Sequence, residues 1–260
     1  MPGLVLLPTS LASSSIALGQ LVVDPLNPSS TSFNTSTPAP TQSKKHSLYK
    51  DVFLQDDEGR FISSVSPHST HSHENLLLVQ SEQAEHISLQ NTSKAFDTLA
   101  TDKSAQQFFQ QTSQTNQPLY YIAGIQKLKN PVYKRVALKD GSITEASAGP
   151  KLRLPIHPRR DSGADLDDTA NDNDNASVIA VEFRKVRCHV GPADEPHVLE
   201  DIGYSWNYLW LEGDEQLSIG LGKAVEAAEL RALAGIVGGE DFTDRSYDNS
   251  TDEDEGVGGF

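Results

Sequence analysis

The sequence predicts an α+β protein with a central, mainly antiparallel, twisted sheet of long hairpins, peripheral helices and a disordered acidic C-terminal tail. Three observations predict this class. Aromatic and branched residues concentrate in segments such as Leu119–Leu128 and Val178–Val190, which is typical of strands. Helical spacing is confined to short stretches. The segment Glu240–Phe260 carries eight acids against one arginine, which is typical of disorder.

Composition narrows the class of protein. The 260 residues carry a net charge of -15, which excludes a nucleic-acid binder over the whole chain because phosphate contacts need positive surface. Cys188 is the only cysteine, so a disulfide framework and a cysteine-based zinc site are excluded. No apolar window is long enough for a transmembrane helix. Because Met1–Leu21 lacks Lys and Arg, we expect no secretory signal but a strand or short helix packed on the core, in a cytoplasmic protein.

The N-terminal half is polar, with few strong signals. Asp24–Ser43 is rich in Ser, Thr and Pro, which predicts a flexible loop. Ser93–Thr112 has apolar residues at roughly helical spacing. Short strands are predicted at the apolar runs Val52–Leu54, Phe61–Ile62 and Leu76–Val79.

The second half is better organised. A strand is predicted at Leu119–Leu128, and it resumes after Pro131 at Val132–Leu138. The apolar phase of Val178–Val190 switches at Arg184–Lys185, which predicts a β-bulge or a bend. Ile202–Leu211 is a further aromatic strand.

A C-terminal helix is predicted over Ser218–Val237, ended by Gly238–Gly239. Its apolar stripe comprises Leu221, Val225, Ala228, Ala232 and Ile236. We therefore divide the chain into a body, residues 1–217, and a C-terminal segment, residues 218–260, which combines this helix with the acidic tail.

Several groups of reactive residues are weak candidates for chemistry. His68, His71 and His73 do not have the spacing of a known structural metal site, so a polar loop is the simpler interpretation. The aspartates of the loop Asp161–Ala176 lack the glycine and terminal Glu of a calcium loop. Cys188 alternates with valines and is expected to be buried. For Trp206 and Trp210 we expect core packing, with an interfacial aromatic anchor as the alternative. The aspartates considered in the loop Asp161–Ala176 are Asp165, Asp167, Asp168, Asp172 and Asp174.

The distribution of charge is more informative than its total. Between Tyr120 and Val190 lie 12 of the 21 basic residues, against three acids once the loop Asp161–Ala176 is set aside. Such residues either protect solvated strand edges or contact an anionic surface. For the second interpretation a phospholipid surface is a better partner than DNA, because the whole-chain charge repels polyanions at long range.

The two basic strand segments carry a resemblance to a known family. The order LYYIAGIQKLKNPVYKRVAL, a long polar loop and then VIAVEFRKVRCHV resembles a long hairpin of the gasdermin pore-forming domain. The resemblance covers about 70 of the 260 residues and is one of residue types and order. The start, rich in Ser and Pro, departs from the animal family, whereas short fungal members have a similar length. The resemblance implies a pore-forming domain, residues 1–217, with a brief inhibitory segment.

The resemblance also implies roles for individual residues. Amphipathic hairpins would extend and close into a barrel, for which about 9 to 11 residues per strand suffice. The residues that would meet acidic headgroups are Lys127, Lys129, Lys134, Arg135, Arg184, Lys185 and Arg187. The residues of the membrane strands would be Tyr121, Ile125, Ile179, Val181 and Phe183. A protease would cut at Gly238, Gly239 or as far as Arg245.

The expected function is therefore a gasdermin-like pore former of fungal type that executes regulated cell death. Its partners would be anionic phospholipids, an activating protease and further copies of itself, with no nucleic acid, cofactor or metal. It would be cytoplasmic when inactive and on a membrane when active. A non-catalytic soluble interaction protein is the alternative. A hydrolase is less favoured, because the sequence has no phosphate-binding glycine loop and no nucleophile elbow.

Overall fold

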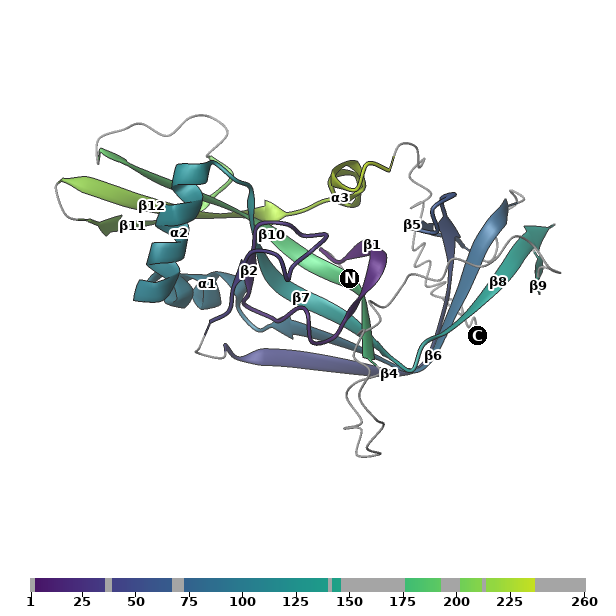
Figure 1. Cartoon of the computed structure of the whole chain (residues 1–260). Coiled ribbons are helices and arrows are strands. Elements are labelled where there is room, and N and C mark those ends of the chain that lie inside the picture. The colour runs from purple at the N-terminus through teal and green to yellow at the C-terminus, as the bar shows by residue number, and fades with distance from the viewer. Residues whose placement is uncertain are drawn as a thin grey trace, which may run out of the picture.

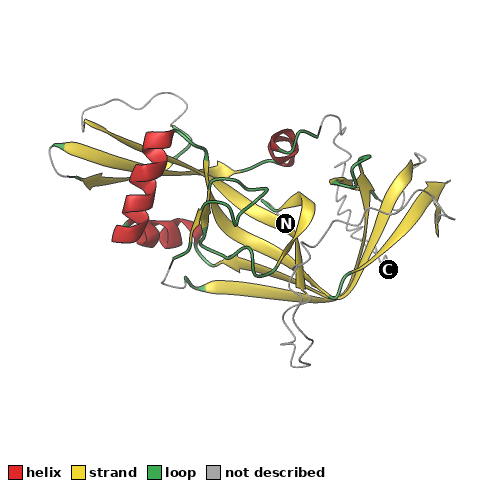
Figure 2. Cartoon of the chain, viewed as in Figure 1, coloured by secondary structure: helices red, strands yellow, loops and turns green. Residues whose placement is uncertain are grey.

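The computed structural model describes residues 3–35, 39–66, 73–139, 142–145, 176–192, 202–211 and 214–236. Within these residues, twelve strands form one sheet, and every strand pair in it is antiparallel. Three helices lie at its periphery (Figures 1 and 2). The predicted α+β class with a mainly antiparallel sheet is confirmed.

The main path of the sheet runs β11-β12-β10-β7-β6-β4-β5, with the shorter strands paired beside it. The strands are β1 (Val5–Ala12), β2 (Leu21–Val22), β3 (Ser32–Phe33), β4 (Thr41–Gln55), β5 (Phe61–Ser64), β6 (His73–Leu89), β7 (Leu119–Lys129), β8 (Val132–Lys139), β9 (Ser142–Glu145), β10 (Ala176–Pro192), β11 (Ser205–Trp210) and β12 (Glu215–Ala224). The helices are α1 (Thr92–Ala100), α2 (Lys103–Thr115) and α3 (Ala227–Leu233).

The centre of the sheet is the pair β7 and β10, the two segments that carry the family resemblance. They pair antiparallel from Ala176 opposite Lys129 to Val186 opposite Leu119. The predicted irregularity is present, because the register of β10 against β12 shifts between Arg184 and Val186. The two predicted strands, and the irregularity predicted within the second of them, are thus confirmed.

The sheet bends sharply along one line that crosses three adjacent strands. On β4, Leu48 has a positive φ of 62° and is 84% exposed. On β6 the line passes Ser81, whose hydroxyl donates to the carbonyl of Lys129. Between β7 and β8 it passes Asn130, with a φ of 47°. Beyond this corner, β5, β8, β9 and the ends of β4 and β6 form an arm (Figure 1).

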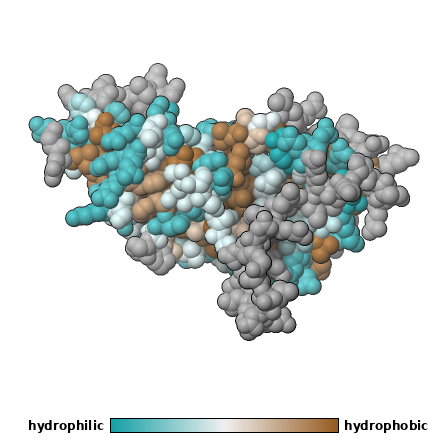
Figure 3. All heavy atoms as spheres, viewed as in Figure 1, coloured by the Kyte–Doolittle hydropathy of each residue, from teal (hydrophilic) through white to brown (hydrophobic). Residues whose placement is uncertain are grey.

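One face of the sheet is covered by α1 and α2. The helical spacing predicted over Ser93–Thr112 is confirmed, and the segment forms two helices because Asp102 accepts the backbone N–H groups of Ser104 and Ala105 and so starts the second. The ring of Phe96 lies edge-on to Phe109 and to Tyr121 of β7, at centroid distances of 6.1 and 5.2 Å. The outward face of α2 is mainly hydrophilic (Figure 3).

The predicted helix Ser218–Val237 is wrong for its first third, which is strand β12. Leu217, Ile219 and Leu221 are buried and alternate with small residues, a period of two rather than 3.6. Gly220 leaves space for the Trp206 ring of β11, and Gly222 leaves space for the ring of Tyr204 just before β11, since a Cβ at Gly222 would lie 2.5 Å from Tyr204. These close approaches favour a strand.

The helix that does form, α3, is short. It ends before Gly235, which has a φ of 66°, and not at Gly238–Gly239 as predicted. Leu230 is its buried residue, whereas Ala228 and Ala232 of the predicted stripe are exposed. The α3 helix packs on β1, which is the predicted N-terminal strand.

The prediction of a flexible loop over Asp24–Ser43 is also wrong for the residues that the structure describes there. Asp24 accepts the N–H of Leu26, and β3 pairs with β2. The Phe33 ring packs against Phe108 of α2. Thr41–Ser43 belongs to β4. Local turns and one aromatic contact therefore order a segment for which composition alone predicts no ordered structure.

Candidate functional site

The seven basic residues predicted to bind lipid lie in two separate groups. Four of them, Lys127, Lys129, Lys134 and Arg135, lie on β7 and β8 around the corner of the sheet. The other three, Arg184, Lys185 and Arg187, lie in the second half of β10. Lys129 is opposite Ala176 and Lys185 is opposite Tyr120, nine residues further along β7. At about 3.3 Å per residue Lys129 and Lys185 are about 30 Å apart along the strand, and the nearest members of the two groups, Lys127 and Arg184, are about 20 Å apart.

Each basic residue of the β10 group already has a partner within the protein. The Nε of Arg184 donates to the carbonyl of Gly222 at 3.0 Å. Lys185 Nζ lies 2.8 Å from Glu229 Oε2 of α3. The guanidinium of Arg187 lies over the ring of Tyr204, 5.3 Å from its centroid. Contact of Lys185 with another anion would therefore require α3 to move.

Three further contacts hold α3 and the residue that follows it on the body. Leu230 is 1% exposed and packs in a cluster with Val5 of β1. Arg60 Nη1 donates to the carbonyl of Ala234 at 2.8 Å. Arg231 Nη1 donates to the carbonyl of Ile62 at 3.4 Å. The α3 helix thus contacts both the central sheet and the β4–β5 turn region.

The five residues predicted for membrane strands are all in the core. None of their side chains is more than 2% exposed: Tyr121, Ile125, Ile179, Val181 and Phe183. They pack in three clusters. One cluster lies under α1 and α2, and a second lies under β1 and α3. Exposure of these side chains to lipid requires the strands to leave their present packing.

A partly buried pair of titratable side chains lies near the centre of the sheet, and sequence reasoning missed it. Glu182 of β10 and His86 of β6 both approach Gly124 of β7, where an added Cβ would lie 3.4 Å from the Glu182 carboxylate and 3.5 Å from His86 Nε2. Burial raises the pKa of Glu182, and Arg184 at 3.9 Å partly opposes this. Burial also lowers the pKa of His86. Only the pairing of β6, β7 and β10 brings these residues together.

The remaining sequence candidates do not form a chemical site. Cys188 is partly buried, and burial raises the pKa of its thiol to about 12, as expected for a residue without a nucleophilic role. The side chains of His68, His71 and His73, the loop Asp161–Asn175 and the predicted cleavage residues Gly238, Gly239 and Arg245 lie outside the described residues. In the described part of the chain no three His, Cys, Asp or Glu side chains gather as metal ligands. No described helix has the length and apolar content needed to cross a bilayer.

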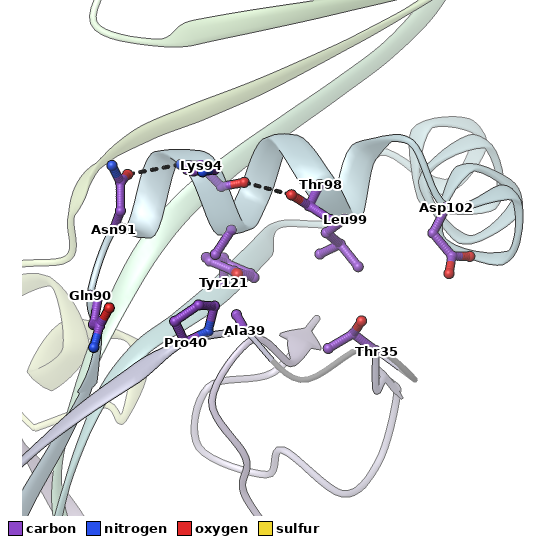
Figure 4. Close-up of a pocket in the computed structure, with 11 residues that line it drawn as sticks. Thr35, Ala39, Pro40, Gln90, Asn91, Lys94, Thr98, Leu99, Asp102 and Tyr121 are labelled. Carbon is purple, nitrogen blue, oxygen red and sulfur yellow. Dashed lines mark hydrogen bonds between the residues drawn. The ribbon is translucent and has the colours of Figure 1, made fainter.

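A cavity of about 400 Å³ lies between α1 and the segment that leads into β4 (Figure 4). Its floor is made by Leu99 and Tyr121. The polar side chains at its rim serve the helices, because Asn91 caps α1 and Asp102 caps α2. Thr98 Oγ1 donates to the carbonyl of Lys94. These three side chains are therefore engaged within the helices, whereas Lys94 also lines the cavity.

The prediction of core packing for the tryptophans is wrong for Trp210, which is 70% exposed. Trp206 is partly buried and lies over Gly220, where an added Cβ would be 2.9 Å from the ring. Both lie on β11, which forms one edge of the main path of the sheet.

Comparison with models of protein families gives no match, and no curated protein matches the chain.

Proposed function

We propose that the chain is a gasdermin-like membrane pore former whose C-terminal segment restrains it. The observation that carries the proposal is the ion pair between Lys185 and Glu229, which joins a predicted lipid-binding residue to the predicted inhibitory segment. An acidic side chain on a short helix thus occupies the position that a lipid headgroup would take. Loss of α3 would expose this positive charge beside the buried apolar strands.

The burial of the predicted membrane residues supports the same interpretation. β7 and β10 have 11 and 17 residues, so each is long enough for the about 9 to 11 residues that a tilted strand needs to cross the hydrocarbon layer. In this structure their apolar side chains pack inside the protein. The proposed active state forms when these strands change partners from core to lipid and from one chain to further copies.

The position of α3 decides where a cut must fall. A cut in the predicted region, Gly238 to Arg245, would follow α3 and leave it attached to β12. A cut before Ser218 would remove β12, which pairs with both β10 and β11. Release of α3 alone requires a cut after Val225, whose N–H donates to the carbonyl of Phe183 at 2.8 Å.

Leakage of dye from vesicles tests the proposal. A site for a sequence-specific protease is inserted between Val225 and Glu226, and the full chain is added to vesicles containing phosphatidylserine or cardiolipin. We expect no leakage before cutting and leakage after it. The matched control carries the same site after Ile236, where cutting leaves α3 in place and leakage stays low.

Sealed vesicles after complete cutting at Val225, in every lipid composition, would contradict the proposal. The chain would then be a non-catalytic interaction protein, with the basic strand residues acting as solubility devices.

A further inference from the structure

The cavity beside α1 has a mainly apolar wall. Helical spacing places Ala95 and Leu99 on the face of α1 that lines it. Ala39 and Pro40 line it from the opposite side, and Tyr121 of β7 lies between them and the helix (Figure 4). Its volume of about 400 Å³ falls within the range of about 300–1,000 Å³ that is typical of pockets for small organic molecules.

A buried phenol borders this cavity without a hydrogen bond. Tyr121 is 1% exposed, and burial raises the pKa of its hydroxyl, which has no hydrogen-bond partner among the described residues. Four side-chain polar atoms in the described part of the chain are completely enclosed without a partner, and the Tyr121 hydroxyl is not one of them. The hydroxyl therefore keeps access to the cavity. Because an unpaired buried donor is costly, it needs an acceptor that the cavity can hold.

An exposed lysine lies on the same wall and makes no ion pair with any described residue. This residue is Lys94 of α1. Asp97, one turn further along α1, accepts from Asn207 Nδ2 at 2.9 Å and is not a residue of the wall. Asp102 accepts two backbone N–H groups at the start of α2, about 12 Å from Lys94 along the helix direction (Figure 4). The positive charge of Lys94 is therefore available to an anion.

The other polar side chains of the described wall already have partners within the protein. They are Thr35, Gln90, Asn91, Thr98 and Asp102. The groups that remain to recognise a ligand are the hydroxyl of Tyr121 and the ammonium of Lys94, and both are donors. The wall thus fits a ligand that presents acceptors to it, with one of them negatively charged.

We propose that this cavity binds a small, mainly apolar carboxylic acid that carries a carbonyl oxygen in its body. The carboxylate pairs with the exposed Lys94, where water still solvates both charges. The carbonyl oxygen accepts from the Tyr121 hydroxyl, and it is uncharged because a second charge at this buried position would be costly. The apolar body lies against Ala95 and Leu99.

This inference goes beyond the proposed function and does not depend on it. The cavity is lined by α1, by the segment that leads into β4 and by Tyr121 of β7. The contacts that hold α3 involve Lys185, Arg60 and the cluster of Leu230, none of which belongs to the described wall of the cavity. The intact chain is therefore expected to bind the acid whether or not α3 is released.

Three probes that differ by one group test this assignment. The compound 5-oxo-5-phenylpentanoic acid has both acceptors, 5-phenylpentanoic acid lacks the carbonyl, and 1-phenyl-1-pentanone lacks the carboxylate. Titration calorimetry of the full chain measures the Kd of each probe, and shifts of the α1 amide resonances locate the site. We expect the keto acid to bind more tightly than either analogue.

Two substitutions assign the two contacts. Tyr121→Phe removes only the hydroxyl, so it should weaken binding of the keto acid about fivefold and leave that of 5-phenylpentanoic acid unchanged. Lys94→Gln should weaken binding of both acids about fivefold and leave that of the ketone unchanged. Lys103→Gln, at an exposed position of α2 outside the wall, is the matched control and should change none of the three. Circular dichroism checks that all variants fold.

The inference is overturned if the keto acid does not bind the wild type at millimolar concentration, or if both substitutions leave its Kd unchanged. Equal weakening of the two acids by Tyr121→Phe also overturns it, because lost packing rather than a lost hydrogen bond would then explain the result. Leakage from vesicles after cutting at Val225 is a separate measurement, so this inference and the pore proposal can fail independently.

Discussion

The helices that cover the two faces of the central sheet differ greatly in how many apolar side chains they bury against it. On one face, α1 and α2 comprise 9 and 13 residues and bury Phe96, Leu99 and Phe109 against Tyr121. On the other, α3 comprises seven residues and buries Leu230. Burial of one leucine contributes about 1.5–3 kcal/mol, and part of that is lost to the ordering of the helix.

The polar contacts of α3 add little to its attachment. The Lys185 and Glu229 side chains are 28% and 35% exposed, so solvent screens their attraction. The difference between the faces indicates that α1 and α2 belong to the folding core, whereas α3 can detach from a sheet that stays folded. This is the property that the proposed function needs.

The largest expected effect comes from the face of α1 and α2. Phe109→Ala removes a ring that is fully buried and should lower the free energy of unfolding by about 3–5 kcal/mol. Denaturant unfolding followed by circular dichroism measures it, with the exposed Gln107→Ala as control. A loss under 1 kcal/mol would contradict the assignment of this face to the folding core.

On the face of α3, Leu230→Ala should have a smaller global effect. The free energy of unfolding should fall by at most about 2 kcal/mol, because the helix can open locally. The amides of Ala227–Leu233 should lose protection from hydrogen exchange while those of β7 keep theirs. Leu233→Ala, at an exposed position, is the control. Equal loss of protection in β7 and α3 would show that they form one cooperative unit.

The partly buried carboxyl group of Glu182 predicts a smaller, pH-dependent effect. The Glu182 carboxyl has a pKa that burial raises above its unfolded value of 4.5. The folded state therefore binds the proton more tightly, and stability is lost as the pH rises through the raised pKa. Glu182→Gln removes this cost, so the variant should be more stable than the wild type at pH 7. The difference should vanish below pH 4.5.

Thermal unfolding of both proteins between pH 4 and pH 8 measures this difference. The matched control is Glu215→Gln, which removes a carboxylate at an exposed position of β12. A stability advantage of Glu182→Gln over the wild type that increases as the pH falls would contradict this prediction.

The smallest expected effect is that of the ion pair of α3. Glu229→Gln should cost less than about 1 kcal/mol in stability, because the pair is partly exposed. It should nevertheless raise sedimentation with acidic vesicles at low salt, since Lys185 loses its partner. The control is Glu226→Gln on the same segment, whose partner Lys223 is 70% exposed. Equal sedimentation of the two variants with acidic vesicles would contradict a special role of Lys185.

Sequence patterns predicted the regions where burial is two-sided. β7 and β10 are rich in branched and aromatic residues, and even the bulge near Arg184 followed from the switch of apolar phase. The N-terminal part of β4 could not be predicted, because all of Thr41–Leu48 is exposed and its strand conformation depends on pairing with β6. A strand paired on one side and solvated on both faces has no apolar signature.

The candidate site was less predictable than the fold. The basic residues were visible in the sequence, but the two groups and the contact of Lys185 with Glu229 depend on register and on how α3 docks. The predicted helix over Ser218–Val237 failed because small residues of β12 satisfy a helical stripe as well as an alternating one. Gly220 and Gly222 are explained only by the rings of Trp206 and Tyr204 that lie against them.

Hydrogen exchange of the cut chain in solution tests the central claim, the separation of α3 from a sheet that remains folded on its other face. The chain is cut between Val225 and Glu226, and exchange is followed before any vesicles are added. The amides of Ala227–Leu233 should then exchange freely, whereas those of α2, Lys103–Thr115, should keep their protection. Leakage from vesicles while α3 stays protected, or loss of protection in α2 together with α3, would contradict the account.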